Sequence, residues 1–196
     1  MLLENLKKHH IILASQSPRR KELLKNLGIN FEVRVKDGIE ETFPEHLQGS
    51  IIATYLAEQK ANVYKNELKE NELLIAADTI VYLDNEVLGK PQNRLEAQQM
   101  LAKLSGRKHE VITGVCLMQK EKFDSFCATS IVYFKELEDC EIDYYIDTYK
   151  PFDKAGSYGI QEWIGYIGIE KIEGSYFNVM GLPVQKLYEK LAEFVK

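Results

Sequence analysis

The segment LLIAADTIVYL, residues 73–83, is an almost unbroken apolar run with the composition of a buried strand. A turn signal, Asp84-Asn85, follows it and leads into EVLG, so we expect a hairpin. Helical patterns lie before and after this hairpin. Strands that neighbour both hairpins and helices indicate an α/β protein with a mixed sheet that contains antiparallel pairs and has flanking helices.

The other elements follow from local start and stop signals. Ser17 and Pro18 fit the N-cap and first position of a helix that Gly28 ends, and Ser50 is predicted to cap a helix with Ile51 on its apolar face. Further helices are expected at 94–104, 138–149 and from 183 onward, and strands at 11–14, 109–119 and 129–137. Residues 163–172 and 175–180 are predicted to form another hairpin.

Length and charge limit the function. A chain of 196 residues with 45% apolar residues fits one domain or two closely packed lobes. Its net charge of -5 argues against general nucleic-acid binding, which needs a basic surface. The N-terminal apolar run is too short for a signal peptide and no segment approaches a membrane span, so we expect a cytoplasmic protein with no membrane partner.

Several common sites are not supported by the sequence. The cysteines are odd in number and widely separated, which favours reduced thiols, and the four histidines are placed so that a zinc site is not expected. The phosphate-binding, dinucleotide-binding and serine-hydrolase signatures GxxxxGK[ST], GxGxxG and GxSxG do not occur.

The first unusual feature is a pair of arginines at the start of a helix. Arg19 and Arg20 follow Pro18 directly, although a helix N-terminus carries partial positive charge and normally attracts Asp or Glu. A bound phosphate chain would explain the pair, because free N–H groups and guanidinium forks both suit phosphate oxygens. Arginines that simply point into water are the alternative.

The second unusual feature is Asp78, a carboxylate within the apolar run. Buried and unpaired it would cost several kcal/mol or more, so it needs a partner. Lys60, Lys90 and a metal ion are candidates, and bonding to neighbouring backbone N–H groups is the structural alternative.

A third stretch, DKAGSYGIQ at 153–161, suits close approach of backbone to a ligand and ends in the amide of Gln161, but it also fits a plain loop.

Together these stretches resemble the Maf family of nucleoside triphosphate pyrophosphatases. The matching motifs run in order from about residue 11 to the last helix: SQSPRR, ADTIV, LGKP, LSGRKHEVITGV, DKAGSYGIQ and GSYFNVMGLP. The resemblance implies an elongated, two-lobed Maf/ITPase-like fold with a central cleft, as a single Maf domain over residues 1–196, often as a homodimer.

The resemblance also implies an activity. Family members cleave a nucleoside triphosphate between its α- and β-phosphates with a divalent cation, Mg²⁺ or Mn²⁺, giving the monophosphate and pyrophosphate. The motifs around Asp78 and Gln161 resemble the YhdE-type branch, which is associated with dTTP and UTP. The family is further linked to septum inhibition and to removal of non-standard nucleotides.

Site roles are carried over by position. Asp78 is implied as the proton acceptor, Lys60 and Lys90 as catalytic cations that hold phosphates, and Glu41 with Asp78 as metal ligands. The substrate-binding positions implied are Ser15, Ser17, Arg19, Arg20, Thr79 and Gln161. Glu162-Trp163 depart from the family pattern, which expects a smaller segment with a glycine after Gln161.

The residues themselves agree with that chemistry. Phosphoanhydride hydrolysis needs cations for positioning and charge stabilisation, and one base for water, and this chain offers such a set. We add the hypothesis that Gln161 reads the O4 and N3–H edge of uracil or thymine. Two other functions stay open: a pyrophosphatase for inosine-type or methylated purine nucleotides, and a non-catalytic regulator of division that binds nucleotide.

Overall fold

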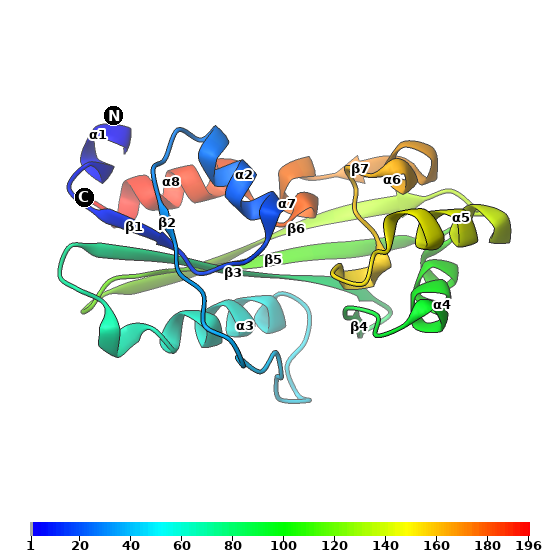
Figure 1. Ribbon diagram of the computed structural model, residues 1–196, viewed down its shortest axis with the longest axis horizontal. Helices are drawn as coiled ribbons and strands as arrows, with labels where there is room; N and C mark the ends of the chain where they lie inside the picture. Colours follow the sequence, from blue (N-terminus) through cyan, green and yellow to red (C-terminus); the bar gives the residue numbers. More distant parts are fainter. Residues whose placement is uncertain (1) are drawn as a thin grey trace. The chain divides into compact units, whose positions relative to one another are not determined.

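The computed structural model describes residues 2–196, so residue 1 of the predicted 1–196 domain lies outside the described residues. The elements in chain order are α1 (Leu2–Leu6), β1 (His10–Leu13), α2 (Pro18–Asn26), β2 (Glu32–Val33), α3 (Ser50–Asn62), a 3₁₀ turn (Lys65–Glu67), β3 (Glu72–Leu83), β4 (Glu86–Leu88), α4 (Arg94–Leu104), β5 (Lys108–Met118), β6 (Phe123–Phe134), α5 (Asp139–Tyr149), a 3₁₀ turn (Ala155–Ser157), α6 (Trp163–Gly168), β7 (Ile169–Glu173), α7 (Tyr176–Met180) and α8 (Val184–Phe194) (Figure 1).

Within the described chain the strands form a seven-stranded sheet in the order β2-β1-β3-β5-β6-β7, with β4 paired to β3. β1 runs parallel to β2 and β3, whereas β4 is antiparallel to β3 and β7 is antiparallel to β6. The predicted mixed α/β sheet with flanking helices is therefore confirmed.

The chain divides into two compact units. The first contains Met1–Asp78, Thr113–Ala128 and Gly181–Lys196, and the second contains Thr79–Ile112 and Thr129–Met180. The predicted arrangement of two lobes around one cleft stays a prediction.

In the first unit, α3 covers one face of β1, β3 and β5. Its Ala57 and Ala61 pack with apolar side chains of these strands, among them Ile12 and Leu74. Helices α2 and α8 lie on the other side of the strands (Figure 1). This layering places the first turn of α2 and the last turn of α3 next to the middle of β3.

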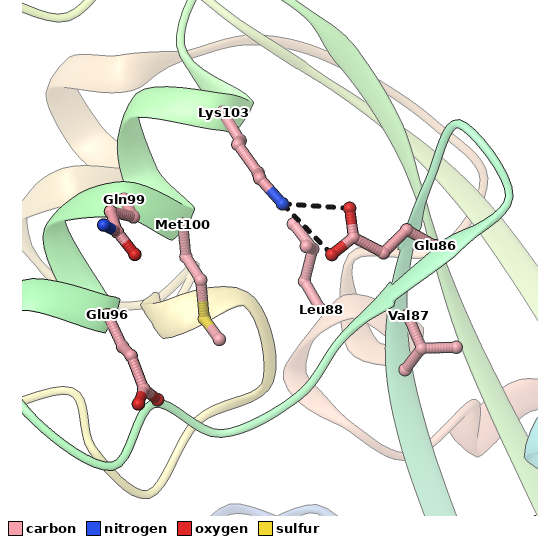
Figure 2. Close-up of a pocket in the computed structure, with 7 residues that line it drawn as sticks. All are labelled: Glu86, Val87, Leu88, Glu96, Gln99, Met100 and Lys103. Carbon is pink, nitrogen blue, oxygen red and sulfur yellow. Dashed lines mark hydrogen bonds and ion pairs between the residues drawn. The ribbon is translucent and has the colours of Figure 1, made fainter.

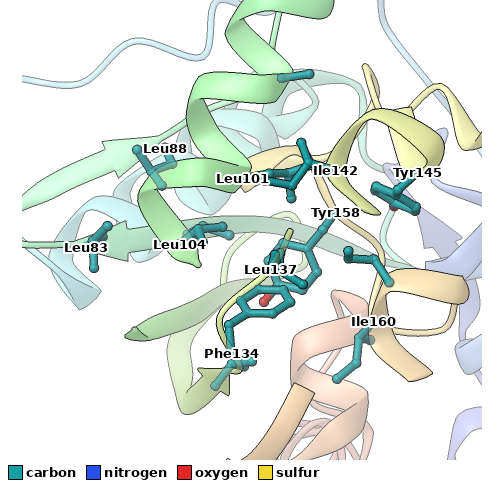
Figure 3. Close-up of a cluster of buried hydrophobic side chains, with 14 of the residues drawn as sticks. Leu83, Leu88, Leu101, Leu104, Phe134, Leu137, Ile142, Tyr145, Tyr158 and Ile160 are labelled. Atoms are coloured by element: carbon teal, nitrogen blue, oxygen red, sulfur yellow. The ribbon is translucent and has the colours of Figure 1, made fainter. Parts of the chain in front are cut away.

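The core of the second unit joins α4 and α5 to the sheet. Leu101 and Leu104 of α4 pack with Ile142 and Tyr145 of α5, and Phe134 and Tyr158 complete the cluster (Figure 3). The loop that leads to Gln161 belongs to the same cluster through Tyr158 and Ile160, so it rests on a packed base.

Local signals placed several helix ends correctly. Ser17 caps α2, and Gly28 follows it with φ 75°. Asn93 caps α4 through a hydrogen bond from the Glu96 N–H, and Pro183 stands at the N-cap of α8.

Other predictions were wrong. Gly49, not Ser50, is the N-cap of α3, and Ile51 is 59% exposed instead of lying on the apolar face. The predicted hairpin of 163–172 with 175–180 does not form, because residues 163–168 and 176–180 are the helices α6 and α7. β7 pairs with β6 instead.

The three cysteines, Cys116, Cys127 and Cys140, are free thiols, as expected. Among residues 2–196, no helix combines the length and apolar character that crossing a membrane requires.

Candidate active site

The start of α2 forms one end of the candidate site. Ser17 accepts a hydrogen bond from the Arg20 N–H at 3.4 Å, and Pro18 occupies the first helical position. Ser15, which is buried, accepts a hydrogen bond from the Ser17 N–H at 3.3 Å. The predicted strand-to-helix turn is thus present, with both serine hydroxyls at its centre.

The Arg20 guanidinium ties this turn to two other segments of the first unit. Its Nε donates to the Gly181 carbonyl at 2.8 Å, and its Nη1 donates to the Ala77 carbonyl at 2.9 Å and to the Ser15 hydroxyl at 3.3 Å. Burial lowers the pKa of Arg20, and the Asp78 carboxylate opposes that shift. The arginine is therefore a fixed positive charge next to the residue that precedes Asp78.

Asp78 is only 7% exposed, and its partner is Lys60. Of the partners that the sequence offers, Lys60 is confirmed: it forms an ion pair with Asp78 from the last turn of α3. The same Lys60 Nζ lies 2.8 Å from the Glu41 Oε1. One ammonium group therefore holds together the two carboxylates that the sequence predicts as metal ligands.

The close packing of α3 on β5 explains where Lys60 lies. A Cβ added at Gly114 of β5 would stand 2.1 Å from the Ala53 carbonyl oxygen, so only glycine lets the helix approach this closely. Ile52 and Leu56 are buried on the same helix. The Lys60 side chain, 14% exposed, is directed to Asp78 as a result.

Two further candidates, Arg19 and Thr79, are the direct neighbours of Arg20 and Asp78 in the chain. Arg19 is half-buried in the first turn of α2, and Thr79 is half-buried directly after Asp78 on β3. Their predicted roles in substrate binding stay predictions.

Lys90 and Gln161 belong to the second unit, as does Thr79. Lys90 is exposed in the loop after β4, and its neighbour Gly89 accepts a hydrogen bond from the Gly156 N–H at 3.0 Å. This bond joins the LGKP segment to the DKAGSYGIQ segment.

The glycines of the second segment are needed for its path. Gly156 has φ 65°, and a Cβ there would lie 2.9 Å from a methyl carbon of Val81. Gln161 is half-buried at the end of the loop, and within the described chain its Oε1 is enclosed without a hydrogen-bond partner. A buried acceptor without a partner is uncommon in folded proteins, and the N–H of a bound ligand is a group that would satisfy it.

Sequence reasoning missed the residues that support this loop. Lys154, Glu162 and Tyr145 form a buried polar network under it. For Lys154 and Glu162 a signal was available, because a lysine and a glutamate stand on either side of a glycine-containing stretch. Tyr145 lies on another helix, and no sequence signal links it to the loop.

In the part of the chain that the structure describes, no group of three or more His, Cys, Asp and Glu side chains is placed to hold a metal ion. Glu41 and Asp78 nevertheless meet at Lys60, and one or two carboxylates with substrate phosphate oxygens are a common Mg²⁺ ligand set. The residues present fit that ion.

A separate hollow of about 120 Å³ lies between β4 and α4, lined by Glu86, Val87, Leu88, Glu96, Gln99, Met100 and Lys103 (Figure 2). Lys103 is paired with Glu86 at 2.9 Å, and Glu96 adds another carboxylate. Because its lining is acidic on balance, this hollow does not suit a phosphate chain.

Comparison with known proteins decides the family. A family model described as Maf-like protein matches residues 10–194. The chain belongs to the Maf-like protein family. The resemblance seen in its motifs is confirmed.

Relatives of this Maf-like protein match along nearly their full length. A dTTP/UTP pyrophosphatase of Phocaeicola vulgatus is 61% identical over 97% of this chain and 98% of its own. The protein of that name from Parabacteroides distasonis is 57% identical over 98% of this chain and 100% of its own. A third, from Flavobacterium johnsoniae, is 52% identical over 100% of both.

Proposed function

We propose that this Maf-like protein is a nucleoside triphosphate pyrophosphatase that hydrolyses dTTP and UTP to the monophosphate and pyrophosphate. Relatives with this name share more than half of its residues over almost the whole chain. The observation that carries the proposal is the buried Asp78, which pairs with Lys60 and directly follows Ala77, whose carbonyl accepts a hydrogen bond from Arg20.

These residues supply what phosphoanhydride hydrolysis needs. Lys60 and Arg20 place positive charge around Asp78, and the serine hydroxyls at the start of α2 suit phosphate oxygens. Asp78 acts as general base towards water once its oxygen is released. For that release, the Lys60 ammonium moves from the carboxylates to the substrate phosphates.

We assign base recognition to Gln161. Uracil and thymine present O4 as an acceptor and N3–H as a donor, and one amide can bind both. The unmatched Gln161 Oε1 supports this role, because N3–H would supply its missing donor. Cytosine has no N3–H, so we expect UTP to be preferred over CTP.

A divalent cation is part of the proposal. Glu41 and Asp78 would hold Mg²⁺ or Mn²⁺ together with phosphate oxygens, and the ion would supply charge neutralisation on the phosphates. Mn²⁺ binding, measured by electron paramagnetic resonance with a non-hydrolysable UTP analogue present, should weaken at least about tenfold in Glu41→Gln. The neighbouring exposed carboxylate, changed in Glu40→Gln, is the matched control; equal Mn²⁺ affinity in both variants would contradict the assignment.

The deciding experiment for the function is a screen of triphosphates with Mg²⁺ and with Mn²⁺, in which both products are identified. We expect fastest turnover of dTTP and UTP, giving monophosphate and pyrophosphate. Preference for inosine-type or methylated purine triphosphates would favour the alternative pyrophosphatase, and nucleotide binding without turnover would favour a regulator. The cytoplasmic location, the homodimer and the role in septum inhibition stay predictions.

A further inference from the structure

A buried charged network lies under the loop that carries Gln161. Lys154 is 6% exposed, and its Nζ lies 2.7 Å from the Asp153 Oδ1 and 3.1 Å from the Glu162 Oε1. The Glu162 side chain is itself 19% exposed. A lysine is almost never buried unless it is paired, so the ion pair between Lys154 and Glu162 is a fixed part of the loop.

Tyr145 of α5 binds the other oxygen of Glu162. The tyrosine is fully buried, and its hydroxyl accepts a hydrogen bond from the Gly159 N–H at 3.0 Å. Since the hydroxyl oxygen serves as acceptor there, its proton is donated to the Glu162 Oε2. Burial, and after it the contact with Glu162, raises the pKa of Tyr145, so the hydroxyl keeps this proton.

These contacts close the turn that contains Gln161. The Glu162 N–H donates to the Gly159 carbonyl at 3.0 Å, so residues 159–162 form a turn with Gln161 at its third position. The Tyr145 hydroxyl contacts the first residue through its N–H and the last through its carboxylate. One side chain from a core helix therefore fixes both ends of the turn.

Gln161 packs at the same point as the network. A Cβ added at Gly159 would lie 2.9 Å from the Glu162 Cδ, 3.0 Å from the Lys154 Cε and 3.1 Å from the Gln161 Nε2. Glu162 occupies the N-cap of α6, yet its side chain makes no cap hydrogen bond and reaches Tyr145 and Lys154 instead. Its carboxylate thus serves the loop rather than the helix.

We propose that Tyr145, Glu162 and Lys154 are positioning residues that hold the Gln161 amide in the orientation for reading a pyrimidine base with an N3–H. This inference rests on the proposed function, and it extends the selectivity site to a residue on α5. Without the network, the turn can relax and Gln161 loses its fixed direction. Base contacts are the same in the ground and transition states, so KM should change rather than kcat.

The test compares steady-state hydrolysis of UTP and CTP by Tyr145→Phe and Glu162→Gln. We expect KM for UTP to rise about tenfold, the loss of one well-placed hydrogen bond, with kcat within about twofold. CTP kinetics should change little, so the preference for UTP falls by the same factor. Glu86→Gln is the control, because it breaks an exposed ion pair in the same unit (Figure 2) and should leave both substrates unaffected.

A double-variant comparison with Gln161→Ala separates a positioning role from general loosening of the fold. In a Gln161→Ala background, adding Tyr145→Phe should cause no further loss of preference. A merely structural role would lower kcat for both bases equally with the preference intact, and that result overturns the inference. Where a single change prevents folding, the double variant Lys154→Met with Glu162→Gln removes both charges together and is measured in the same way.

The same data distinguish failure of the positioning role from failure of the proposed function. If Gln161→Ala loses the UTP preference but Tyr145→Phe and Glu162→Gln keep it, only the positioning role is overturned. If the unmodified protein shows no preference for UTP over CTP, or Gln161→Ala retains it, base recognition by Gln161 fails and this inference fails with it.

Discussion

Lys60 lies between two carboxylates, Asp78 and Glu41, that the proposed reaction needs for other tasks. The ammonium group compensates both charges, which allows Asp78 to stay buried without a large desolvation cost. Substrate phosphates offer the same ammonium an alternative partner. In the proposed mechanism the site is therefore stable before binding and becomes competent when phosphate draws the lysine away.

Asp78→Asn tests the base at this position. The amide has nearly the same shape but cannot accept a proton, so kcat should fall about 10²- to 10⁴-fold, the usual contribution of a general base. Pyrophosphate release measures the loss, and calorimetric binding of a non-hydrolysable UTP analogue checks that the nucleotide still binds.

The control for Asp78 is Glu67→Gln. Glu67 is another carboxylate of the first unit paired with a lysine, Lys36, but it is exposed. It should retain full turnover. An Asp78→Asn enzyme with more than about a tenth of normal kcat would rule out the base assignment.

We expect His109 to make the stability of the protein depend on pH. The ring is 3% exposed between Phe134 and Tyr158, and its Nε2 lies 2.7 Å from the Tyr158 hydroxyl. Burial lowers the pKa of His109 to about 4. Below about pH 6.5 the unfolded chain therefore binds a proton that the folded protein does not, and the stability from this group is lost as pH falls towards 4.

Urea unfolding at several pH values between 7 and 4.5 tests this. As the pH falls, the free energy of unfolding should decline more steeply in the unmodified protein than in His109→Gln, which cannot titrate at this position. The two slopes should differ by up to about 1.4 kcal/mol per pH unit. The two curves should therefore converge as the pH is lowered. Parallel curves would show that His109 does not contribute.

At the scale of elements, the α3–β5 contact sets the position of Lys60. Gly114→Ala would push a methyl group against the Ala53 carbonyl and force the helix away from the strand. We expect at least about 1–3 kcal/mol of destabilisation, with a loss of turnover because Lys60 moves with α3. Chemical denaturation and UTP hydrolysis measure the two effects.

Gly89→Ala is the matched control for that change. An added Cβ at Gly89 meets nothing within 4 Å, so its unfolding free energy should not fall appreciably. Equal destabilisation by the two substitutions would mean that helix packing is not the cause.

The elements that were predictable are those with local chemical signals. Ser17, Pro18 and Asn93 act within one turn of themselves, so their helix starts can be read from sequence. Residues 163–168 carry isoleucines and a tryptophan that suit a strand equally well. Their helix depends on Gly165, where a Cβ would stand 1.8 Å from the Ile160 carbonyl oxygen, and such a tertiary contact has no local signature.

The same distinction holds for the candidate site. The need of Asp78 for a partner follows from its apolar surroundings, which are visible in the sequence. Selecting Lys60 requires the packing of α3, and finding Tyr145 requires knowing that α5 lies against the 159–162 turn. Charge and burial are predictable from composition along the chain, whereas pairing between distant segments is not.

At the scale of the whole molecule, the two units are not consecutive pieces of chain. Three of their four boundaries, Asp78–Thr79, Ile112–Thr113 and Ala128–Thr129, fall inside β3, β5 and β6, and the fourth is Met180–Gly181. Independent domains are normally joined by exposed linkers that few hydrogen bonds cross. A strand that belongs to both units cannot lose its pairing in one half without disturbing the ladder in the other.

We therefore expect one cooperative unfolding transition, and core truncations in either unit should lower it. Leu74 and Leu101 are both fully buried, the first in the cluster under α3 and the second in the α4–α5 cluster. Leu74→Ala and Leu101→Ala should each remove about 2–5 kcal/mol and shift the same single calorimetric peak, with equal calorimetric and van't Hoff enthalpies. Two peaks, each moved by only one of these substitutions, would mean that the shared strands do not couple the units.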